Sequence, residues 1–217
     1  MFTGIVEEKG HIIAVSKQAN SLKLTIQATR ILSDVKVGDS ISVNGVCLTV
    51  TSFNQQQFSV DVMPETYRHS SLSRAKAGTE VNLERAMQAN GRFGGHFVSG
   101  HVDTFGEIKR IWTEANARYL EVQVDPNSIK YLMPKGSVTV DGTSLTVFEV
   151  KASAFVISLI PETQQATILG EKQQGDIVNL EYDMLAKYME HLLRNHKHSE
   201  QDNPLTAQTL KENGFMD

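Results

Sequence analysis

The chain has 217 residues, enough for one large domain or for two domains of about 100 residues each. Its formal net charge is −4, and no stretch concentrates lysine and arginine as a phosphate-binding face requires, so we expect no nucleic-acid partner. No run of about 18 apolar residues occurs and residues 1–6 lack the basic start of a signal peptide, so we expect no membrane partner and a cytoplasmic location. The single cysteine, Cys47, excludes an internal disulfide framework.

The first half of the chain contains short apolar runs that are rich in Val, Ile, Thr and Phe. In Leu22–Ile26 and Phe58–Val62 apolar and polar residues alternate, which is typical of half-buried strands. Asn44-Gly45 lies between two such runs and predicts a two-residue type I′ turn, which needs positive φ at both positions. Short strands joined by short turns favour a closed antiparallel barrel, because closure leaves no exposed edge. We also predict a short helix within Pro64–Lys76.

The sequence then repeats itself at a distance of about 97 residues, well above the roughly 20–50 residues of solenoid repeats. Residues 40–84 match residues 137–181 at about 16 of 45 positions without a gap, and the Asn44-Gly45 turn returns as Asp141-Gly142. The repeat predicts an all-β protein of two tandem homologous six-stranded antiparallel Greek-key barrels. We place the barrels at residues 1–87 and 97–183, with a glycine-rich passage between them.

After Glu181 the pattern changes to helical spacing. Apolar residues recur at i, i+4 and i+8, which predicts one C-terminal amphipathic helix over residues 184–197. A short helix with a continuous apolar face needs a partner, so it either packs on its own barrels or joins copies of the chain, and we favour an oligomerisation helix. Residues 198–217 are expected to form a polar, mobile tail with a weak helical segment at Pro204–Asn213.

Small polar residues that recur in both halves are the candidates for a functional site. Cys47 and Ser144 occupy the same place after the turn glycine, and Thr49 and Thr146 lie two residues further on the same strand face. Taken singly, such residues fit strand propensity, and a Pro-Glu-Thr triplet fits the start of a helix. A fold does not by itself need the same hydroxyls and carboxylates in both copies, however, so the repetition predicts two similar pockets for two similar ligands.

Metal binding is not expected, because His96 and His101 lack the spacing and companion residues of a zinc site. The histidines His191, His196 and His198 fall on the predicted helix and its end, where a solvated face is the simpler interpretation.

Several segments, in this order along the chain, closely resemble riboflavin synthase of the alpha-chain type. Any one of them is a weak signal, but together, on both repeats, they are highly specific for that family over residues 1 to about 190. The segments are Met1–Glu7, Asn44–Val50, Pro64–Thr66, Val81–Ala86, Gly94–Asp103 and Asp141–Val147.

The resemblance implies an enzyme, a transferase that joins two molecules of 6,7-dimethyl-8-ribityllumazine. One molecule passes a four-carbon unit to the other, which gives riboflavin and 5-amino-6-ribitylamino-uracil, and no cofactor is implied. Members of the family are homotrimers whose active site forms between the N-terminal barrel of one subunit and the C-terminal barrel of its neighbour. Two copies of one pocket that hold two identical substrates would supply proximity and orientation.

The resemblance also implies the residues that bind substrate, which we divide between two pockets. The N-terminal pocket is expected to contain Gly4, Ile5, Val6, Cys47, Leu48, Thr49, Asp61, Val62, Met63, Pro64, Glu65 and Thr66. The C-terminal pocket is expected to contain Gly100, His101, Val102, Ser144, Leu145, Thr146, Ser158, Leu159, Ile160, Pro161, Glu162 and Thr163, with Lys135 reaching across from the adjacent subunit.

Three of these residues are candidates for catalysis. His101 is the first candidate for the proton transfer, and Cys47 and Ser144 are candidates for nucleophile or hydrogen-bond donor. For Cys47 the simpler alternative, a small buried thiol, stays open. Phe2 and Asp183 match the family pattern as a pocket wall and as a polar residue at the subunit boundary, and we expect His96 to shape the glycine turn.

The alternative function is that of a non-catalytic lumazine- or flavin-binding protein with the same double-barrel fold, such as the lumazine and yellow fluorescent proteins of luminous bacteria. The pattern of those proteins departs from that of the enzyme in one of the two pockets. Here Cys47-Leu48-Thr49 and Ser144-Leu145-Thr146 are both intact, which favours the enzyme.

Overall fold

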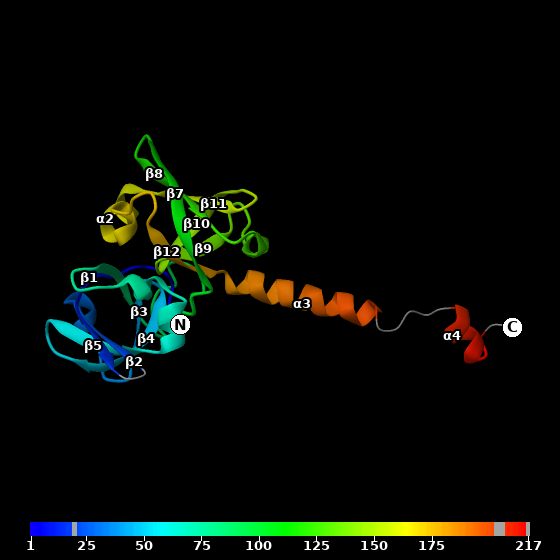
Figure 1. Ribbon diagram of the computed structural model, residues 1–217, viewed down its shortest axis with the longest axis horizontal. Helices are drawn as coiled ribbons and strands as arrows, with labels where there is room; N and C mark the ends of the chain where they lie inside the picture. The colour runs from blue at the N-terminus through cyan, green and yellow to red at the C-terminus, as the bar shows by residue number, and fades with distance from the viewer. Residues whose placement is uncertain (19–20, 202–206, 216–217) are drawn as a thin grey trace. The chain divides into compact units, whose positions relative to one another are not determined.

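The structure is a computed structural model that describes residues 1–18, 21–201 and 207–215. As predicted, most of the chain forms two closed six-stranded antiparallel barrels (Figure 1). The first barrel has the strand order β1-β2-β5-β4-β3-β6. Its strands are β1 (Glu8–Gln18), β2 (Ser21–Gln27), β3 (Ser40–Val43), β4 (Val46–Phe53), β5 (Gln57–Val62) and β6 (Glu80–Arg85).

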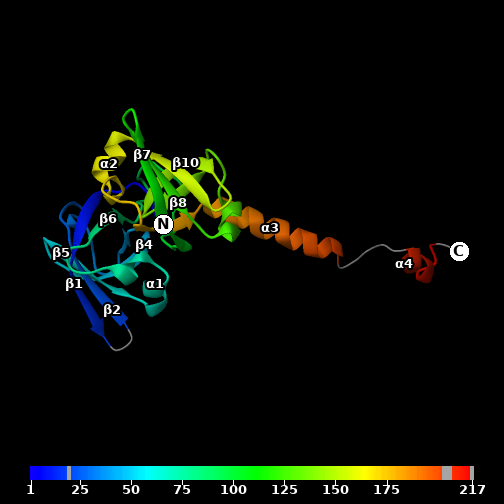
Figure 2. The same ribbon diagram turned by 45° about the horizontal axis from the view of Figure 1, so that its top comes forward.

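The second barrel repeats this topology, with β7-β8-β11-β10-β9-β12 in place of the six strands of the first. Its strands are β7 (Thr104–Glu114), β8 (Ala117–Gln123), β9 (Ser137–Val140), β10 (Thr143–Val150), β11 (Ala154–Leu159) and β12 (Ile177–Tyr182). The short helices α1 (Pro64–Arg68) and α2 (Pro161–Ala166) follow the equivalent strands β5 and β11 (Figure 2). Each has Pro at its first position, where the missing N–H costs no helical hydrogen bond.

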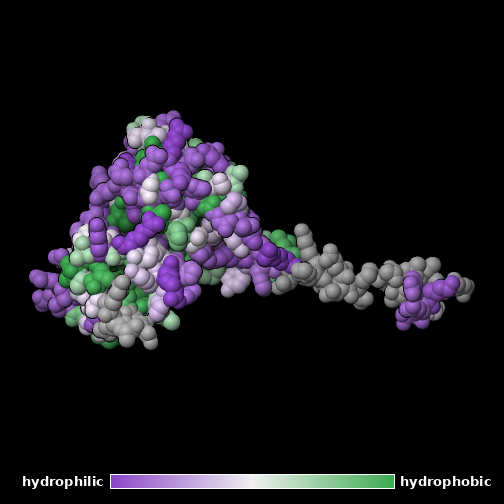
Figure 3. All heavy atoms as spheres, viewed as in Figure 1, coloured by the Kyte–Doolittle hydropathy of each residue, from purple (hydrophilic) through white to green (hydrophobic). Residues whose placement is uncertain are grey.

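Each barrel has its own apolar interior. Phe58 in the first barrel and its counterpart Phe155 in the second are completely buried, and burial of such a side chain contributes about 1.5–3 kcal/mol. The face of the molecule drawn in Figure 3 is mostly hydrophilic, with separate hydrophobic areas. The strand alternation therefore directs apolar side chains inward and leaves the outward-facing positions available for a site.

The two hairpin turns of the repeat contact each other. Asn44 and Gly45 have φ values of 49° and 82°, and Asp141 and Gly142 have 44° and 78°, which confirms the predicted turns. A Cβ atom on Gly45 would lie 2.9 Å from the backbone nitrogen of Gly142, and one on Gly142 would lie 2.7 Å from that of Gly45. Glycine is thus needed at both turns for close approach as well as for positive φ.

Two buried asparagines extend this contact between the barrels. The side-chain amide of Asn82 donates to the carbonyl oxygen of Asp141 at 2.8 Å, and that of Asn179 donates to the carbonyl oxygen of Asn44, also at 2.8 Å. The backbone N–H of Ile168 donates to the Asn82 amide oxygen at 2.9 Å. These reciprocal bonds join the barrels through a symmetric polar contact, in which both asparagine amide groups donate to the hairpin of the other barrel.

The chain divides into two compact units: Met1–Met184, which contains both barrels, and the C-terminal unit Leu185–Asp217. Helix α3 (Met184–Gln201) continues past the predicted end at residue 197, because residues 194–201 contain no Gly or Pro to end it. Helix α4 (Ala207–Glu212) falls within the predicted weak helical segment, while residues 202–206 and 216–217 of the expected tail lie outside the described residues. The apolar side chains of α3 are 59–62% exposed, namely Leu185, Tyr188, Met189, Leu192 and Leu193. None of the helices in the described ranges is long and apolar enough to cross a membrane.

Candidate functional site

Each barrel is preceded by a short segment that reaches the hairpin of the other barrel. We call residues 3–6 and 99–102 the leading segments. The backbone N–H of Ser144 donates to the carbonyl oxygen of Gly4 at 2.7 Å, and that of Cys47 donates to the carbonyl oxygen of Gly100 at 2.8 Å. A Cβ atom on Gly4 would lie 2.6 Å from the Ser144 Cβ, and one on Gly100 would lie equally close to the Cys47 Cβ. Both glycines have positive φ, so neither position accepts another residue without strain.

The predicted division of residues between the two pockets is therefore wrong in one respect. Gly4–Val6 lies against Ser144 rather than Cys47, and Gly100–Val102 lies against Cys47 rather than Ser144. Val102 also packs against the interior cluster of the first barrel. A repeat shows which positions are equivalent, but it does not show whether a segment stays on its own barrel.

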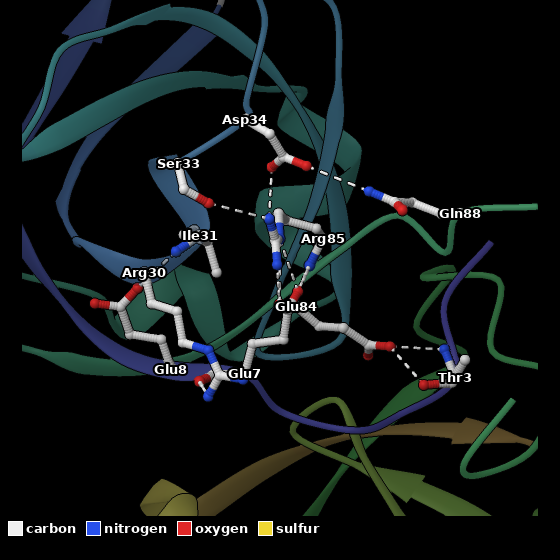
Figure 4. A network of polar contacts seen from close by, with 10 residues as sticks. All are labelled: Thr3, Glu7, Glu8, Arg30, Ile31, Ser33, Asp34, Glu84, Arg85 and Gln88. Atoms are coloured by element: carbon white, nitrogen blue, oxygen red, sulfur yellow. Dashed lines mark hydrogen bonds and ion pairs between the residues drawn. The ribbon is translucent and has the colours of Figure 1, made fainter. Parts of the chain in front are cut away.

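A buried carboxylate fixes each leading segment to the last strand of its own barrel. Glu84 accepts hydrogen bonds from the N–H and hydroxyl of Thr3 at 2.7 and 2.9 Å (Figure 4). It also accepts one from the N–H of Gly4 at 3.0 Å. Glu181 accepts the equivalent bonds from Ser99 and Gly100 at 2.6–2.9 Å. Burial raises the pKa of Glu84, and the hydrogen bonds from Thr3 and Gly4 oppose this shift. Each leading segment is thus held at one end by its own barrel while it contacts the other.

Arg85, next to Glu84, forms ion pairs with Glu7 and Asp34 (Figure 4). Burial alone would raise the pKa of Glu7, but the Arg85 guanidinium holds it below its ordinary value. A cavity of about 470 Å³ lies beside this network, lined among others by Thr3, Ile5, Ser40, Glu84, Arg85 and Arg92. It includes neither Cys47 nor Ser144. The Arg85 guanidinium in this cavity is already paired with the carboxylates of Glu7 and Asp34, so it is not free to bind an anionic ligand.

The first half-site is a cavity of about 350 Å³ at the hairpin of the first barrel. It brings together six of the predicted residues, namely Cys47, Glu65, Thr66, Gly100, His101 and Val102. Cys47 is half-buried and His101 is exposed. Glu65 is exposed, and hydrogen bonds from Arg68, with the nearby His69, hold its pKa below the ordinary value. The cavity therefore combines a thiol, an imidazole and a carboxylate from three parts of the chain.

The second half-site contains His96, which was predicted only to shape the glycine turn. The Nδ1 atom of His96 lies 2.7 Å from the Ser144 hydroxyl, and its Nε2 atom lies 3.1 Å from the Thr139 hydroxyl. The imidazole is only 9% exposed, and burial lowers its pKa although Asp183 opposes the shift. A neutral imidazole that donates from Nε2 to Thr139 can accept the Ser144 proton at Nδ1.

One sequence signal for His96 was the glycine that precedes it. A Cβ atom on Gly95 would collide with the carbonyl oxygen of Thr3 and lie 2.9 Å from the Ser144 hydroxyl oxygen. Paired glycines before a polar residue can mark a close approach to a second segment, but the sequence alone does not show that this segment carries Ser144.

The remaining predicted residues divide by the direction of their side chains. Thr49 and Asp61 face outward on neighbouring strands, as do Thr146 and Ser158. The exposed residues also include Met63 and Ile160, at 70% and 60%, and the adjacent Pro64, Pro161 and Glu162, with Thr163 half-buried. Four residues point instead into the barrel interiors, where they are at most 8% exposed, and can offer a ligand only their backbone: Leu48, Val62, Leu145 and Leu159.

Lys135 lies in a turn before β9 and has a φ of 67°, in the left-handed region that favours glycine. Its counterpart in the first barrel is Gly38, with a φ of 97°. The N–H of Lys135 donates to the carbonyl oxygen of Val147, as the N–H of Gly38 does to that of Val50. The same turn is thus built with a side chain in one barrel and without one in the other.

The geometry defines a class of protein in which two homologous barrels each place a hairpin with a polar side chain against the leading segment of the other barrel. The family described as "Lumazine binding domain" matches the chain twice, at residues 3–86 and 99–183. Riboflavin synthases of Bacillus subtilis (strain 168) and Actinobacillus pleuropneumoniae are 52% and 49% identical to the chain over 215 residues, which is 99% of this chain and 100% of each relative. The riboflavin synthase of Schizosaccharomyces pombe is 44% identical over 198 residues, or 90% of this chain and 95% of the relative. The chain belongs to the riboflavin synthase family, a family of transferases.

Solved structures of LumP have the same fold. LumP complexed with 6,7-dimethyl-8-(1'-D-ribityl) lumazine superimposes with a TM-score of 0.76, and LumP complexed with riboflavin with a TM-score of 0.78. Each match covers 84% of this chain and 99% of the LumP chain at 23% sequence identity. At 23% sequence identity, the similarity between this chain and LumP shows a common fold only.

Proposed function

We propose that the chain catalyses the dismutation of two 6,7-dimethyl-8-ribityllumazine molecules to riboflavin and 5-amino-6-ribitylamino-uracil by transfer of a four-carbon unit. The observation that carries this proposal is the pair of half-sites, each built from the hairpin of one barrel and the leading segment of the other. A reaction between two identical molecules needs two similar pockets, and a binding protein for one ligand needs only one.

The chemistry requires that a proton leaves the C7 methyl group of one lumazine and that a nucleophile adds to the ring of the other. The resulting carbanion is delocalised into its own ring, so the protein supplies positioning and general acid–base help, typically worth about 10²–10⁴-fold. We assign the proton transfer to His101 in the first half-site. Cys47 and Ser144 are the nucleophile or hydrogen-bond donors, and His96 is placed to accept a proton from Ser144.

Recognition of the substrate falls to the outward-facing polar groups. The hydroxyls of Thr49 and Thr146, each of which can donate and accept, suit the pyrimidinedione edge, which carries both donors and acceptors. Asp61 and Ser158 are adjacent to these threonines on the next strand, and Glu65 and Glu162 follow at the starts of α1 and α2. These carboxylates and hydroxyls suit the hydroxyl groups of the ribityl chain.

The active form in this proposal is a homotrimer in which the first half-site of one copy faces the second half-site of the next, with two lumazine molecules per site. The exposed apolar side chains of α3 fit a contact between copies, since a continuous apolar stripe is stable when covered. In this proposal the Lys135 side chain reaches across this boundary. Its left-handed backbone supports such a role, because backbone strain of this kind is concentrated at functional positions. We also place the enzyme in the cytoplasm, without a cofactor.

The test is to incubate the purified chain with 6,7-dimethyl-8-ribityllumazine alone, in the presence of a chelator, and to follow flavin absorbance. Riboflavin should form with one equivalent of the uracil product for each flavin. A matched Ser144→Ala variant should bind lumazine but turn it over far more slowly. Binding of one lumazine per chain without any flavin would instead support the non-catalytic binding protein and would overturn the enzyme proposal.

A further inference from the structure

An aromatic cluster lies on the outer face of the second barrel. The rings of Trp112 and Tyr119 are stacked, with centroids 5.1 Å apart and planes at 7°. The ring of Phe148 meets that of Tyr119 at 72°, with centroids 5.4 Å apart, and the Arg110 guanidinium lies 5.0 Å from the centre of the Trp112 ring. Phe148 is nevertheless 59% exposed. Its neighbours thus restrict the orientation of the Phe148 ring while much of it remains open to solvent.

The cluster is continuous with the second half-site. Tyr119 on β8 is directly opposite Ser158 on β11, and the register of β10 with β11 places Thr146 beside Ser158. Phe148 follows Thr146 by two residues on β10 and faces the same side, because the intervening Val147 is completely buried. A β-bulge between Val147 and Glu149 sets the direction of the Phe148 side chain, and bulges commonly re-aim a side chain beside an active site.

The first barrel shows that the fold itself does not need these aromatic residues. Its strand β4 has the same bulge, between Val50 and Ser52, but the residue there is Thr51, whose hydroxyl donates to the carbonyl oxygen of Ser59 at 3.1 Å. Lys23 takes the place of Tyr119 opposite Asp61, and Ser16 takes the place of Trp112 opposite Lys23. The two half-sites therefore have a threonine at the same position, Thr49 in the first and Thr146 in the second. They differ in the side chains of the neighbouring strands.

We propose that Phe148 is a specificity-determining residue of the second half-site, which offers its ring to the flat heterocycle of a lumazine or flavin bound beside Thr146. Tyr119 and Trp112 are positioning residues that hold this ring. The second half-site consequently binds flat rings more tightly than the first half-site. In the first half-site the equivalent positions are Thr51, with a hydroxyl group, and Lys23, with a charged ammonium group. This inference rests on the proposed function, because it takes the ligand from it.

The size of the effect follows from ring stacking. Contact between an aromatic side chain and a flat heterocycle typically contributes enough to change affinity about tenfold, or about 1.4 kcal/mol. Fixing the ring in advance adds to this, since less side-chain freedom is lost on binding. Riboflavin has one more fused ring than lumazine and should benefit most.

The experiment is a titration of the full chain with riboflavin, followed by quenching of flavin fluorescence. The natural sequence should show two classes of binding sites. In Phe148→Thr, which copies the first barrel, the tighter class should weaken about tenfold while the other is unchanged. In the reciprocal Thr51→Phe, the weaker class should tighten. Val37→Thr, which replaces an apolar side chain that is 65% exposed in a turn of the first barrel, is the matched control and should change neither.

The outcomes separate this inference from the proposed function. If the natural sequence converts lumazine and binds riboflavin, but Phe148→Thr binds it equally well, the inference is overturned and the function stands. If the natural sequence neither converts lumazine nor binds riboflavin, both fail. Sedimentation velocity is measured in parallel. A Phe148→Thr variant that loses only its oligomeric state would show that the cluster is a contact between copies, which also overturns the inference.

Discussion

At the scale of single residues, several positions in or near the proposed site have an unfavourable backbone conformation or bury a titratable group. Lys135 keeps a left-handed backbone where the equivalent position is glycine, His96 buries a titratable ring, and Asp141 buries a carboxylate that lies 3.2 Å from the Lys172 ammonium. The sequence predicted Lys135 only through the resemblance and missed the contact of His96 with Ser144. Backbone conformation and a contact 48 residues away leave little trace in a single sequence.

Replacing Lys135 by glycine separates stability from activity. Glycine relieves about 1 kcal/mol of strain from the left-handed backbone but increases the conformational entropy of the unfolded chain. The free energy of unfolding should therefore differ from that of the natural sequence by less than about 1 kcal/mol. Turnover should fall at least tenfold. The control is Ala115→Gly, at another residue with positive φ (52°), which should behave alike in stability and keep full activity. Chemical denaturation and the lumazine assay measure both, and full activity of Lys135→Gly would remove this residue from the site.

The burial of His96 predicts a pH dependence of stability. Because its pKa is lowered in the folded protein, the unfolded chain takes up the proton more readily, and the free energy of unfolding falls as the pH drops below the ordinary value of 6.5. The contribution is fully present above that pH. In His96→Gln this part of the loss should disappear, so stability curves measured between pH 7.5 and pH 5 should be flatter than those of the natural sequence. Parallel curves would show that His96 is not buried as a neutral ring.

At the scale of structural elements, most of the fold could be predicted from the sequence repeat. Turn residues and strand alternation are local properties, so the Asn44-Gly45 and Asp141-Gly142 turns, the strands and helix α1 followed from the sequence. The crossing of the leading segments did not, because it depends on which hairpin lies nearer once the barrels have packed. The buried asparagines Asn82 and Asn179 lie at equivalent positions of the repeat, but the sequence did not predict that they join the barrels.

Gly100→Ala and Gly4→Ala distinguish the crossed arrangement from the one predicted. A methyl group on Gly100 would meet Cys47, and a methyl group on Gly4 would meet Ser144. The rate at which the Cys47 thiol reacts with an aromatic disulfide reagent should therefore change severalfold in Gly100→Ala and remain the same in Gly4→Ala. The opposite pattern would restore the sequence-based grouping.

Asn82→Ala tests the contact between the barrels. The change leaves the carbonyl oxygen of Asp141 and the N–H of Ile168 without their buried partner, and each such loss costs about 1–3 kcal/mol. We expect the free energy of unfolding to fall by roughly 2–4 kcal/mol. Asn127→Ala, at an exposed residue of the short 3₁₀ helix Pro126–Tyr131, should change it by less than about 0.5 kcal/mol. Calorimetry of both variants measures this difference. A small change in the free energy of unfolding of Asn82→Ala would mean that water replaces the hydrogen bonds of the Asn82 side chain.

At the scale of the whole molecule, both barrels belong to one compact unit that ends at Met184. Deleting residues 185–217 should therefore leave a folded protein whose far-UV circular dichroism loses the helical signal of α3 and α4 and keeps that of the β-strands. If α3 joins the copies, this protein should sediment as a monomer and lose most of its turnover, because each proposed active site needs two chains. A fully active monomer would contradict the shared site, and an inactive trimer would move the role of α3 from assembly to catalysis.

The contact between Gly45 and Gly142 has a consequence for how such a molecule can change over generations. If single barrels paired through this turn as identical copies, every substitution would appear on both sides of the contact at once, and both substrates would meet the same surroundings. Joining the two copies in one chain lets each side vary alone while the glycines stay. Three pairs of equivalent positions differ in this way, namely Asn44 and Asp141, Cys47 and Ser144, and Thr51 and Phe148. The covalent link between the barrels thus permits two pockets of common origin to divide the work of one reaction.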